Sequence, residues 1–228
     1  MDAGQKRAWL REFELNGFVL LRNFLPRELV REMYEQLMPL LAAEHKKAVA
    51  EGWSAGRSPG RLALHLEQFA RLPIGPLADP RYSANPIVEE LVDELLGAGN
   101  WKRGWTTVEA CWKGSQYMGW HSDQMPAHAA DPARSNDTIR VTYNVPLVDF
   151  TWRTGAMELL PATHRMPRDW GGLDDVANIY PQRLRLDRGD ALLRDGNIFH
   201  RGTPNLDDAP RPMLDQTYLK YSGDVARP

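Results

Sequence analysis

The spacing of apolar residues changes about halfway along the chain, from a helical period to a period of two. Before residue 97, apolar positions recur every three or four residues in three segments, which predicts three helices. Asn16-Gly17 and Gly97 end the first and third of these, because Gly tolerates the left-handed backbone at a helix C-terminus. The predicted helices cover residues 5–15, 26 to about 46–52, and 86–96, and an apolar strand at 18–21 separates the first two.

Short stretches that alternate between apolar and polar residues dominate the second half of the chain. Alternation predicts strands with one buried face, and helices followed by many short strands predict an α+β chain whose strands close on themselves as a jelly roll. The segment 124–137 is polar and too long for a hairpin turn, so we expect a lid loop there. The expected strands are 61–67, 106–112, 139–145, 155–161, 182–186, 190–193 and 215–221.

Composition bounds the class of protein and its partners. The 228 residues suffice for a single domain, 1–228, and the 28 basic and 30 acidic residues give a formal charge of -2 without a long run of one sign. We therefore expect a small-molecule substrate, no nucleic acid or membrane partner, and a monomer or homodimer. The single cysteine, Cys111, excludes an internal disulfide and is typical of a reducing compartment. With no leader or membrane span evident, we expect a cytoplasmic protein.

One short segment, 119–123, carries the candidate chemistry. If it is extended, His121 and Asp123 leave the same face, because side chains alternate along a strand. His200 follows far downstream in an apolar run that also reads as a strand. Two imidazoles and one carboxylate on one face of an octahedron leave three positions open, as in non-haem Fe(II) oxygenases. Arg211, eleven residues after His200, offers the rigid charged fork that the far carboxylate of 2-oxoglutarate needs.

A second His-x-acid pair, His65-Leu66-Glu67, lies in the alternating stretch 61–67. It lacks the downstream histidine and arginine that accompany the first pair. Because the spacing alone is a weak signal, we keep this pair as the weaker candidate for the metal site.

Taken in order, these residues resemble the phytanoyl-CoA dioxygenase family of Fe(II)- and 2-oxoglutarate-dependent oxygenases. The resemblance implies a double-stranded β-helix, a cupin-like jelly roll, with the N-terminal helices packed on one sheet. It also implies that His121, Asp123 and His200 ligate Fe(II) as the catalytic centre, that Arg211 binds 2-oxoglutarate, and that O2 is the oxidant. The matching stretches are 16–21, His121-Ser122-Asp123, 155–165, Gly189-Asp190, and His200 with Asn205 and Arg211.

The resemblance also suggests further contacts to the cosubstrate. Asn144 stands where the family often has a tryptophan, and Thr142 lies on the same face of the expected strand. Glu109 aligns with a position on the cosubstrate side, and His65 aligns with a basic one. Gly202 stands where the family often has a serine, two residues after the distal histidine, and Thr203 follows it.

Substrate contacts are expected from Trp120, beside the metal motif, Trp152, in a polar turn, and His128, in the expected lid. That lid offers only Arg134 against Asp131 and Asp137, whereas the phosphates of a coenzyme A thioester need clustered cations. A glycoside or an oligosaccharide antibiotic intermediate therefore fits better.

We therefore expect a dioxygenase that oxidises an unactivated C–H bond of a specialised metabolite, by hydroxylation or by oxidative ring or bridge closure. Two alternatives remain open. One is a catalytically silent binding module of the same fold. The other, with the same His, Asp and His ligands, is a zinc-dependent hydrolase.

Overall fold

The computed structural model describes residues 1–53, 59–69, 74–123, 137–166 and 180–221. Helix α1 begins after Asp2, whose carboxylate accepts a hydrogen bond from the Gln5 amide, and ends at Gly17 with a φ of 83°. Asn85 caps α4 in the same way, with proline in the first turn. The helices are α1 (Ala3–Asn16), α2 (Arg27–Ala50), α3 (Pro80–Ser83) and α4 (Pro86–Leu96), with short 3-10 turns at Leu66–Phe69, Gly75–Ala78 and Thr163–Arg165.

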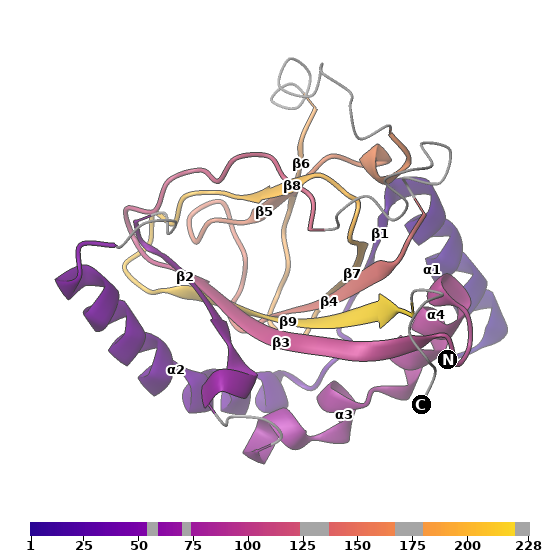
Figure 1. Ribbon diagram of the computed structural model, residues 1–228, viewed down its shortest axis with the longest axis horizontal. Helices are drawn as coiled ribbons and strands as arrows, with labels where there is room; N and C mark the ends of the chain where they lie inside the picture. The colour runs from indigo at the N-terminus through magenta and orange to yellow at the C-terminus, as the bar shows by residue number, and fades with distance from the viewer. Residues whose placement is uncertain (54–58, 70–73, 124–136, 167–179, 222–228) are drawn as a thin grey trace.

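Two antiparallel sheets face each other in the described residues (Figure 1). The larger has six strands in the order β1-β7-β4-β9-β3-β2, and the smaller has three in the order β6-β5-β8. Strands adjacent in sequence, such as β7 and β8, lie in different sheets, so the chain winds as a jelly roll. The strands are β1 (Phe18–Leu21), β2 (Arg61–His65), β3 (Trp101–Cys111), β4 (Arg140–Pro146), β5 (Met157–Leu159), β6 (Gln182–Leu184), β7 (Ala191–Asp195), β8 (His200–Gly202) and β9 (Arg211–Lys220).

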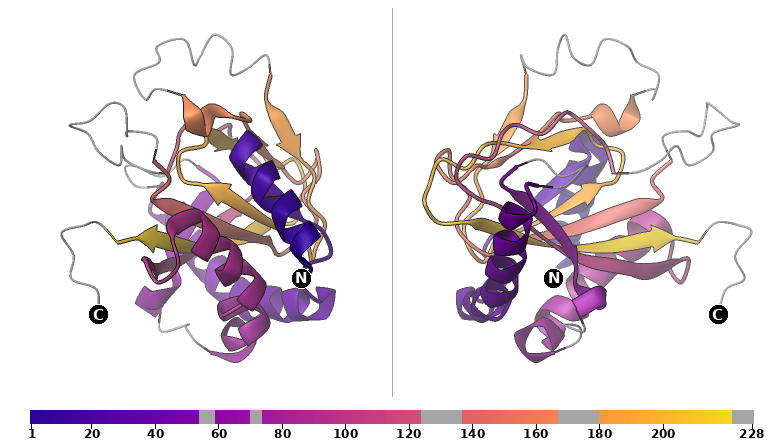
Figure 2. Two further views of the ribbon diagram at one scale, coloured as in Figure 1. Left: turned by 90° about the vertical axis from the view of Figure 1, so that its right-hand side faces the viewer. Right: turned by 60° about the vertical axis from the view of Figure 1, so that its left-hand side comes forward.

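The helices cover one face of the six-stranded sheet, and the three-stranded sheet covers the other (Figures 1 and 2). Leu29, Met33 and Leu37 of α2 are buried at helical spacing, in one cluster with Tyr143 and Val145 of β4. A second cluster of buried apolar residues lies between the two sheets and includes Phe18, Phe150, Met157, Leu184, Leu192 and Met213. Because side chains alternate along each strand, the residues between those of the first cluster face inward, toward the three-stranded sheet.

The structure confirms the α+β jelly roll, the three predicted helices and the strand at 18–21. Strands β3 and β9 begin earlier than predicted, because they pair with each other from Trp101 to Cys111 around a bulge that interrupts the alternation.

The expectation of one strand running up to His200 is wrong. β7 ends at Asp195, whose side chain accepts a hydrogen bond from the Asn197 amide over 2.7 Å, and this turn leads to β8 in the other sheet.

The expected lid at 124–137 lies outside the described residues except for Asp137. No helix in the described ranges combines the length and the apolar character needed to span a membrane.

Gly17 joins α1 to β1, and its substitution tests how tightly this junction is packed. Gly17→Ala is expected to lower the free energy of unfolding by about 1–2 kcal/mol through the left-handed backbone alone. The loss should be larger, because the added Cβ would lie 2.6 Å from Nδ1 of the buried His164. Chemical denaturation measures it, and Gly99→Ala is the control, since Gly99 has a φ of +65° and nothing within 4 Å of its Cβ. Equal losses in the two variants would contradict a tight contact with His164.

Candidate metal centre

Backbone pairing brings two histidines together from distant parts of the sequence. The His121 amide donates to the His200 carbonyl over 3.1 Å, and the His200 amide donates back over 2.9 Å. Residues that exchange both bonds lie directly opposite each other, with their side chains on the same face. The two imidazole rings accordingly lie with their centroids 4.4 Å apart. The segment before Asp123 therefore runs extended beside β8.

Asp123 completes a cluster of three side chains that could hold a metal ion. Its Oδ1 lies 3.9 Å from Nε2 of His121 and 3.7 Å from Nε2 of His200. The Nδ1 atoms lie 2.9 Å and 3.0 Å from the carbonyl oxygens of Gly119 and Ile198, so each Nδ1–H donates to the backbone and each Nε2 lone pair faces the carboxylate. One ligand atom from each residue lies within 4.8 Å of the other two, a spacing suited to a single ion.

The charges in this cluster suit a divalent cation. Burial would by itself raise the pKa of Asp123, but its positive surroundings, led by Arg194, hold that pKa well below the usual range. Burial, and then the charge of Arg194, lower the pKa of His200 to about 3. At neutral pH the site thus holds a carboxylate anion and a neutral imidazole, the forms that bind metals. Two nitrogens and one oxygen suit Fe(II) and leave positions for other ligands.

A buried arginine that sequence reasoning missed orients Asp123. Arg194 in β7 is 3% exposed, and its Nη2 donates to Asp123 Oδ2 over 2.6 Å, which leaves Oδ1 for a metal. Its Nε donates to Asn144 Oδ1 over 2.9 Å, and Asn144 donates in turn to Asp215. Arg140 adds a longer contact to Asp123 Oδ2 at 3.4 Å. The sequence did offer a signal for Arg194, which is a charged residue in a mostly apolar strand, because charged residues are rarely buried without partners.

The expected cosubstrate residues all lie on the inward face of the six-stranded sheet. The pairing register arranges this face in rows that cross the strands. Thr142 pairs with Thr217 of β9, which lies six residues, or about 20 Å, along that strand from Arg211. Thr142 and Arg211 therefore cannot hold the same carboxylate. Burial, and then the charge of Glu109, raise the pKa of Asp215 well above its usual range. The rows are Arg61, Cys111 and Arg211; Ala63, Glu109 and Met213; His65, Thr107, Asp215 and Asn144; and Thr142, Thr217 and Arg194.

Arg211 presents its guanidinium fork on this face. The residue is 6% exposed, its Nε donates to Cys111 Sγ over 3.1 Å, and its Cζ lies 4.4 Å from the centre of the Phe150 ring. These contacts fix the direction of the side chain. Among the described residues, no carboxylate forms an ion pair with either Nη of Arg211. The fork is therefore available to an anionic ligand.

Trp120 and Trp152 lie on the outer face of the three-stranded sheet, and the structure does not bring them to the metal ligands. Trp120 precedes His121 in an extended segment and so points the opposite way, where Arg201 Cζ lies 4.3 Å from the centre of a Trp120 ring. Trp152 is 73% exposed and stacks with Arg183. The expected substrate wall is thus not formed by these two residues, and His128 lies outside the described residues.

Trp105 is an aromatic residue that lies closer to the site. Arg140, a contact of Asp123, places its Cζ 5.4 Å from the centre of a Trp105 ring, and the centre of the His65 ring lies 6.2 Å from the centre of the Trp105 ring.

The second His-x-acid pair, His65 and Glu67, does not form a metal site of this kind. Glu67 accepts a hydrogen bond from the Thr106 amide over 2.6 Å, so its carboxylate is engaged by the backbone of β3. In the ranges described, the histidine and acidic side chains that lie close enough together to hold a metal ion are those of His121, Asp123 and His200.

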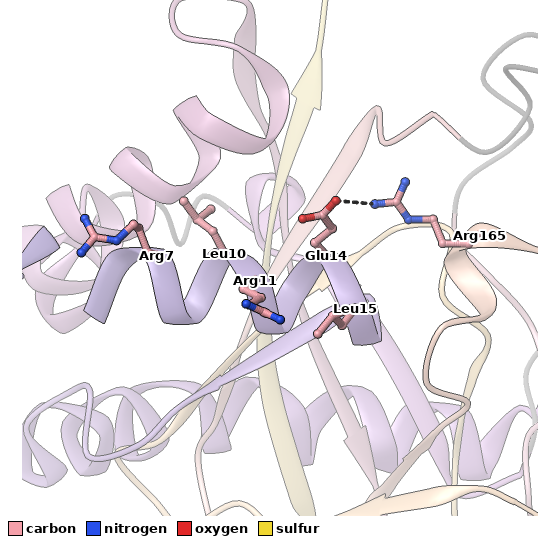
Figure 3. Close-up of a pocket in the computed structure, with 6 residues that line it drawn as sticks. All are labelled: Arg7, Leu10, Arg11, Glu14, Leu15 and Arg165. Carbon is pink, nitrogen blue, oxygen red and sulfur yellow. Dashed lines mark ion pairs between the residues drawn. The ribbon is translucent and has the colours of Figure 1, made fainter. Parts of the chain in front are cut away.

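A separate hollow lies on the surface of α1 (Figure 3). Its volume is about 670 Å³, and two of its lining residues, Glu14 and Arg165, form an ion pair at 3.7 Å. None of its residues belongs to the inward face of the six-stranded sheet. The lining residues are Arg7, Leu10, Arg11, Glu14, Leu15 and Arg165.

The chain is similar to known proteins in sequence and in fold. Residues 13–213 match the family model described as phytanoyl-CoA dioxygenase (PhyH). The fold is similar to that of the epimerase SnoN in complex with Fe3+, alpha ketoglutarate and nogalamycin RO, at 17% identity, a TM-score of 0.68, and coverage of 96% of this chain and 85% of that one. It is also similar to AviO1 from Streptomyces viridochromogenes, at 15% identity and a TM-score of 0.70, with both chains covered completely. EctD from S. alaskensis with bound Fe aligns at 20% identity and a TM-score of 0.67, over 100% of this chain and 80% of that one.

Replacing Arg194 should weaken metal binding. A lysine keeps the charge but cannot serve both Asp123 and Asn144 with a planar fork, so Arg194→Lys should lower the affinity for Fe(II) or Mn(II) about 10- to 100-fold. Anaerobic calorimetric titration with the metal measures this. Arg183→Lys, which alters an equivalent pair with Glu158 on the outer face, is the control. Unchanged metal affinity in Arg194→Lys would show that the backbone alone positions Asp123.

Proposed function

Because the chain belongs to the phytanoyl-CoA dioxygenase family, we propose that its single domain is an Fe(II)- and 2-oxoglutarate-dependent dioxygenase that acts on a small molecule. One observation carries this proposal. The three candidate ligands lie within 4.8 Å of one another, and the inward face beside them carries an arginine fork. A metal ion and a dicarboxylate that binds it at one end would use both features.

Different residues would bind the metal ion and the cosubstrate. His121, Asp123 and His200 would hold Fe(II) through Nε2, Oδ1 and Nε2, and three coordination positions would remain. When bound, Fe(II) with 2-oxoglutarate and O2 supplies the oxidising power, with succinate and carbon dioxide as the co-products. Arg211 would bind the far carboxylate of 2-oxoglutarate and so direct its oxo-acid end toward the ligands. Apolar residues between the sheets, such as Phe150, keep water from this end of the site.

The substrate is proposed to be a specialised metabolite, such as a glycoside or an oligosaccharide antibiotic intermediate. The fold similarity to the epimerase SnoN in complex with nogalamycin RO supports a small-molecule substrate of this kind. Trp105, 39% exposed and next to Arg140, offers an apolar ring face near the metal ligands in place of Trp120 and Trp152. Hydroxylation and ring or bridge closure both fit, and the cytoplasmic location and the monomeric or homodimeric state stay predictions.

The two alternative functions are less well supported. A zinc hydrolase could use the same three ligands but has no use for an arginine fork on the inward face beside them. A silent binding module would not need a buried arginine to hold one oxygen of Asp123 and leave the other facing two imidazole nitrogens. The family membership favours the dioxygenase over both.

Removing one ligand tests the metal site. Asp123→Ala is expected to reduce the formation of succinate from 2-oxoglutarate at least 100-fold, because two imidazoles alone hold Fe(II) weakly. Succinate release under air measures this, and circular dichroism checks that the fold is retained. His121→Ala and His200→Ala should behave alike, whereas His45→Ala, outside the site, should not change the rate. Full activity in Asp123→Ala would contradict the assignment.

Arg211→Lys tests the cosubstrate anchor. The substitution keeps the charge but loses the bidentate fork, so the Michaelis constant for 2-oxoglutarate should rise about tenfold or more. Fe(II) affinity, measured separately by anaerobic titration, should change little. If the Michaelis constant stays the same, the far carboxylate binds elsewhere on the inward face.

A further inference from the structure

Arg61 lies in the same row of the inward face as Arg211, with Cys111 between them. The register pairs Arg61 with Cys111, and Cys111 with Arg211, across β2, β3 and β9. Neighbouring strands lie about 4.8 Å apart, so the two arginine backbones are about 10 Å apart and their long side chains can reach a common point. Burial is the main cause that lowers the pKa of Arg61, and against the opposing effect of Cys111 the charge of Arg211 lowers it further, so the two cations are close enough to interact.

The guanidinium of Arg61 occupies space that a side chain at position 202 would need. A Cβ added to Gly202 would lie 2.6 Å from Arg61 Nη1 and 3.1 Å from its Cζ. Gly202 follows His200 by two residues on β8, so it shares the face of that candidate ligand and lies about 7 Å further along. Arg61 thus reaches from the six-stranded sheet to the strand that carries His200.

Backbone carbonyls hold part of the Arg61 guanidinium. Nε and Nη2 donate to the Gln116 carbonyl at 3.1 Å and 2.7 Å, and Nη2 also donates to the Thr203 carbonyl at 2.8 Å. The bonds to these two carbonyls use Nε and Nη2, and the guanidinium also lies close enough to the Cys111 thiol for that group to raise the pKa of Arg61. The Thr203 hydroxyl is not available to donate to a cosubstrate, because it donates to the Ala156 carbonyl over 2.6 Å.

We propose that Arg61 is a second cationic anchor for the cosubstrate, and that Arg61 and Arg211 together bind the far carboxylate of 2-oxoglutarate. This inference rests on the proposed function. Two neighbouring guanidinium groups repel each other until an anion lies between them, and a carboxylate can accept from both. Gly202 is then required because any larger residue would displace Arg61 Nη1.

The test compares two ligands that differ only at the far end. 2-Oxopentanoate has a methyl group where 2-oxoglutarate has its far carboxylate. Binding of each to the anaerobic Fe(II)-loaded protein is measured by calorimetry. Arg61→Gln should weaken 2-oxoglutarate about 10- to 100-fold and leave 2-oxopentanoate unchanged, so the ratio of the two affinities falls. Arg61→Lys should restore part of the ratio, because it restores the charge.

Two variants separate this role from a structural one. If Arg61 only ties the carbonyls of Gln116 and Thr203, Arg61→Gln weakens both ligands equally or neither, and the proposal fails. Arg201→Gln is the matched control, since Arg201 precedes Gly202 on β8 but pairs with Glu158 on the outer face, and the ratio should stay at the wild-type value.

Exchange of side chains gives a second test. Gly202→Ser alone should weaken the binding of 2-oxoglutarate, because its Cβ would displace Arg61, whereas Gly202→Ser added to Arg61→Ala should cause no further loss of affinity. A further loss in the double variant, equal to that of Gly202→Ser alone, would contradict the shared space. If the wild-type protein itself binds both ligands equally or not at all, the proposed function fails; if it discriminates and Arg61→Gln still does, only the role of Arg61 fails.

Discussion

The ion pair between Arg194 and Asp123 is the interaction on which the candidate site depends. A fully buried guanidinium costs several kcal/mol unless an opposite charge is paired with it. Asp123 Oδ2 accepts from one edge of Arg194 and Asn144 accepts from Nε, so the side chain has a single arrangement. That arrangement turns Asp123 Oδ1 toward the Nε2 atoms of His121 and His200. Removal of this constraint would leave a rotatable carboxylate on a segment outside the main strands.

The six-stranded sheet separates stability from chemistry by alternation. In β4, Val141, Tyr143 and Val145 pack against the helices, whereas Thr142 and Asn144 face inward. The outward face needs only apolar volume, which many sequences supply. The inward face needs particular charges in particular rows, because a carboxylate or a metal is bound only where matching groups converge. The low identity to proteins of the same fold, 15% to 20% for those compared, is consistent with this division.

Alternation also explains where the candidate residues lie. His121, Asp123, Glu109, Asn144, Thr142 and Arg211 all follow the period of two and all face the interior of the jelly roll. Trp120 was considered for its nearness to His121 in sequence, but adjacent residues in an extended chain point to opposite sides. It stacks with Arg201 on the outer face, and Trp105, near Arg140, lies closer to the ligands.

The sequence by itself determined α1, α2, α4 and the jelly roll, and it singled out the four residues proposed for the centre of the candidate site. Helical spacing with Gly17 and Gly97 as stops defined α1 and α4, and the order of His-x-Asp, a distant histidine and an arginine, together with the family resemblance, indicated a metal site. Only the tertiary structure decided that His200 opens β8, that Arg194 holds Asp123, and that Arg61 occupies the space beside Gly202. These contacts join strands far apart in the chain, and they depend on register and on which face each side chain takes, which local spacing does not specify.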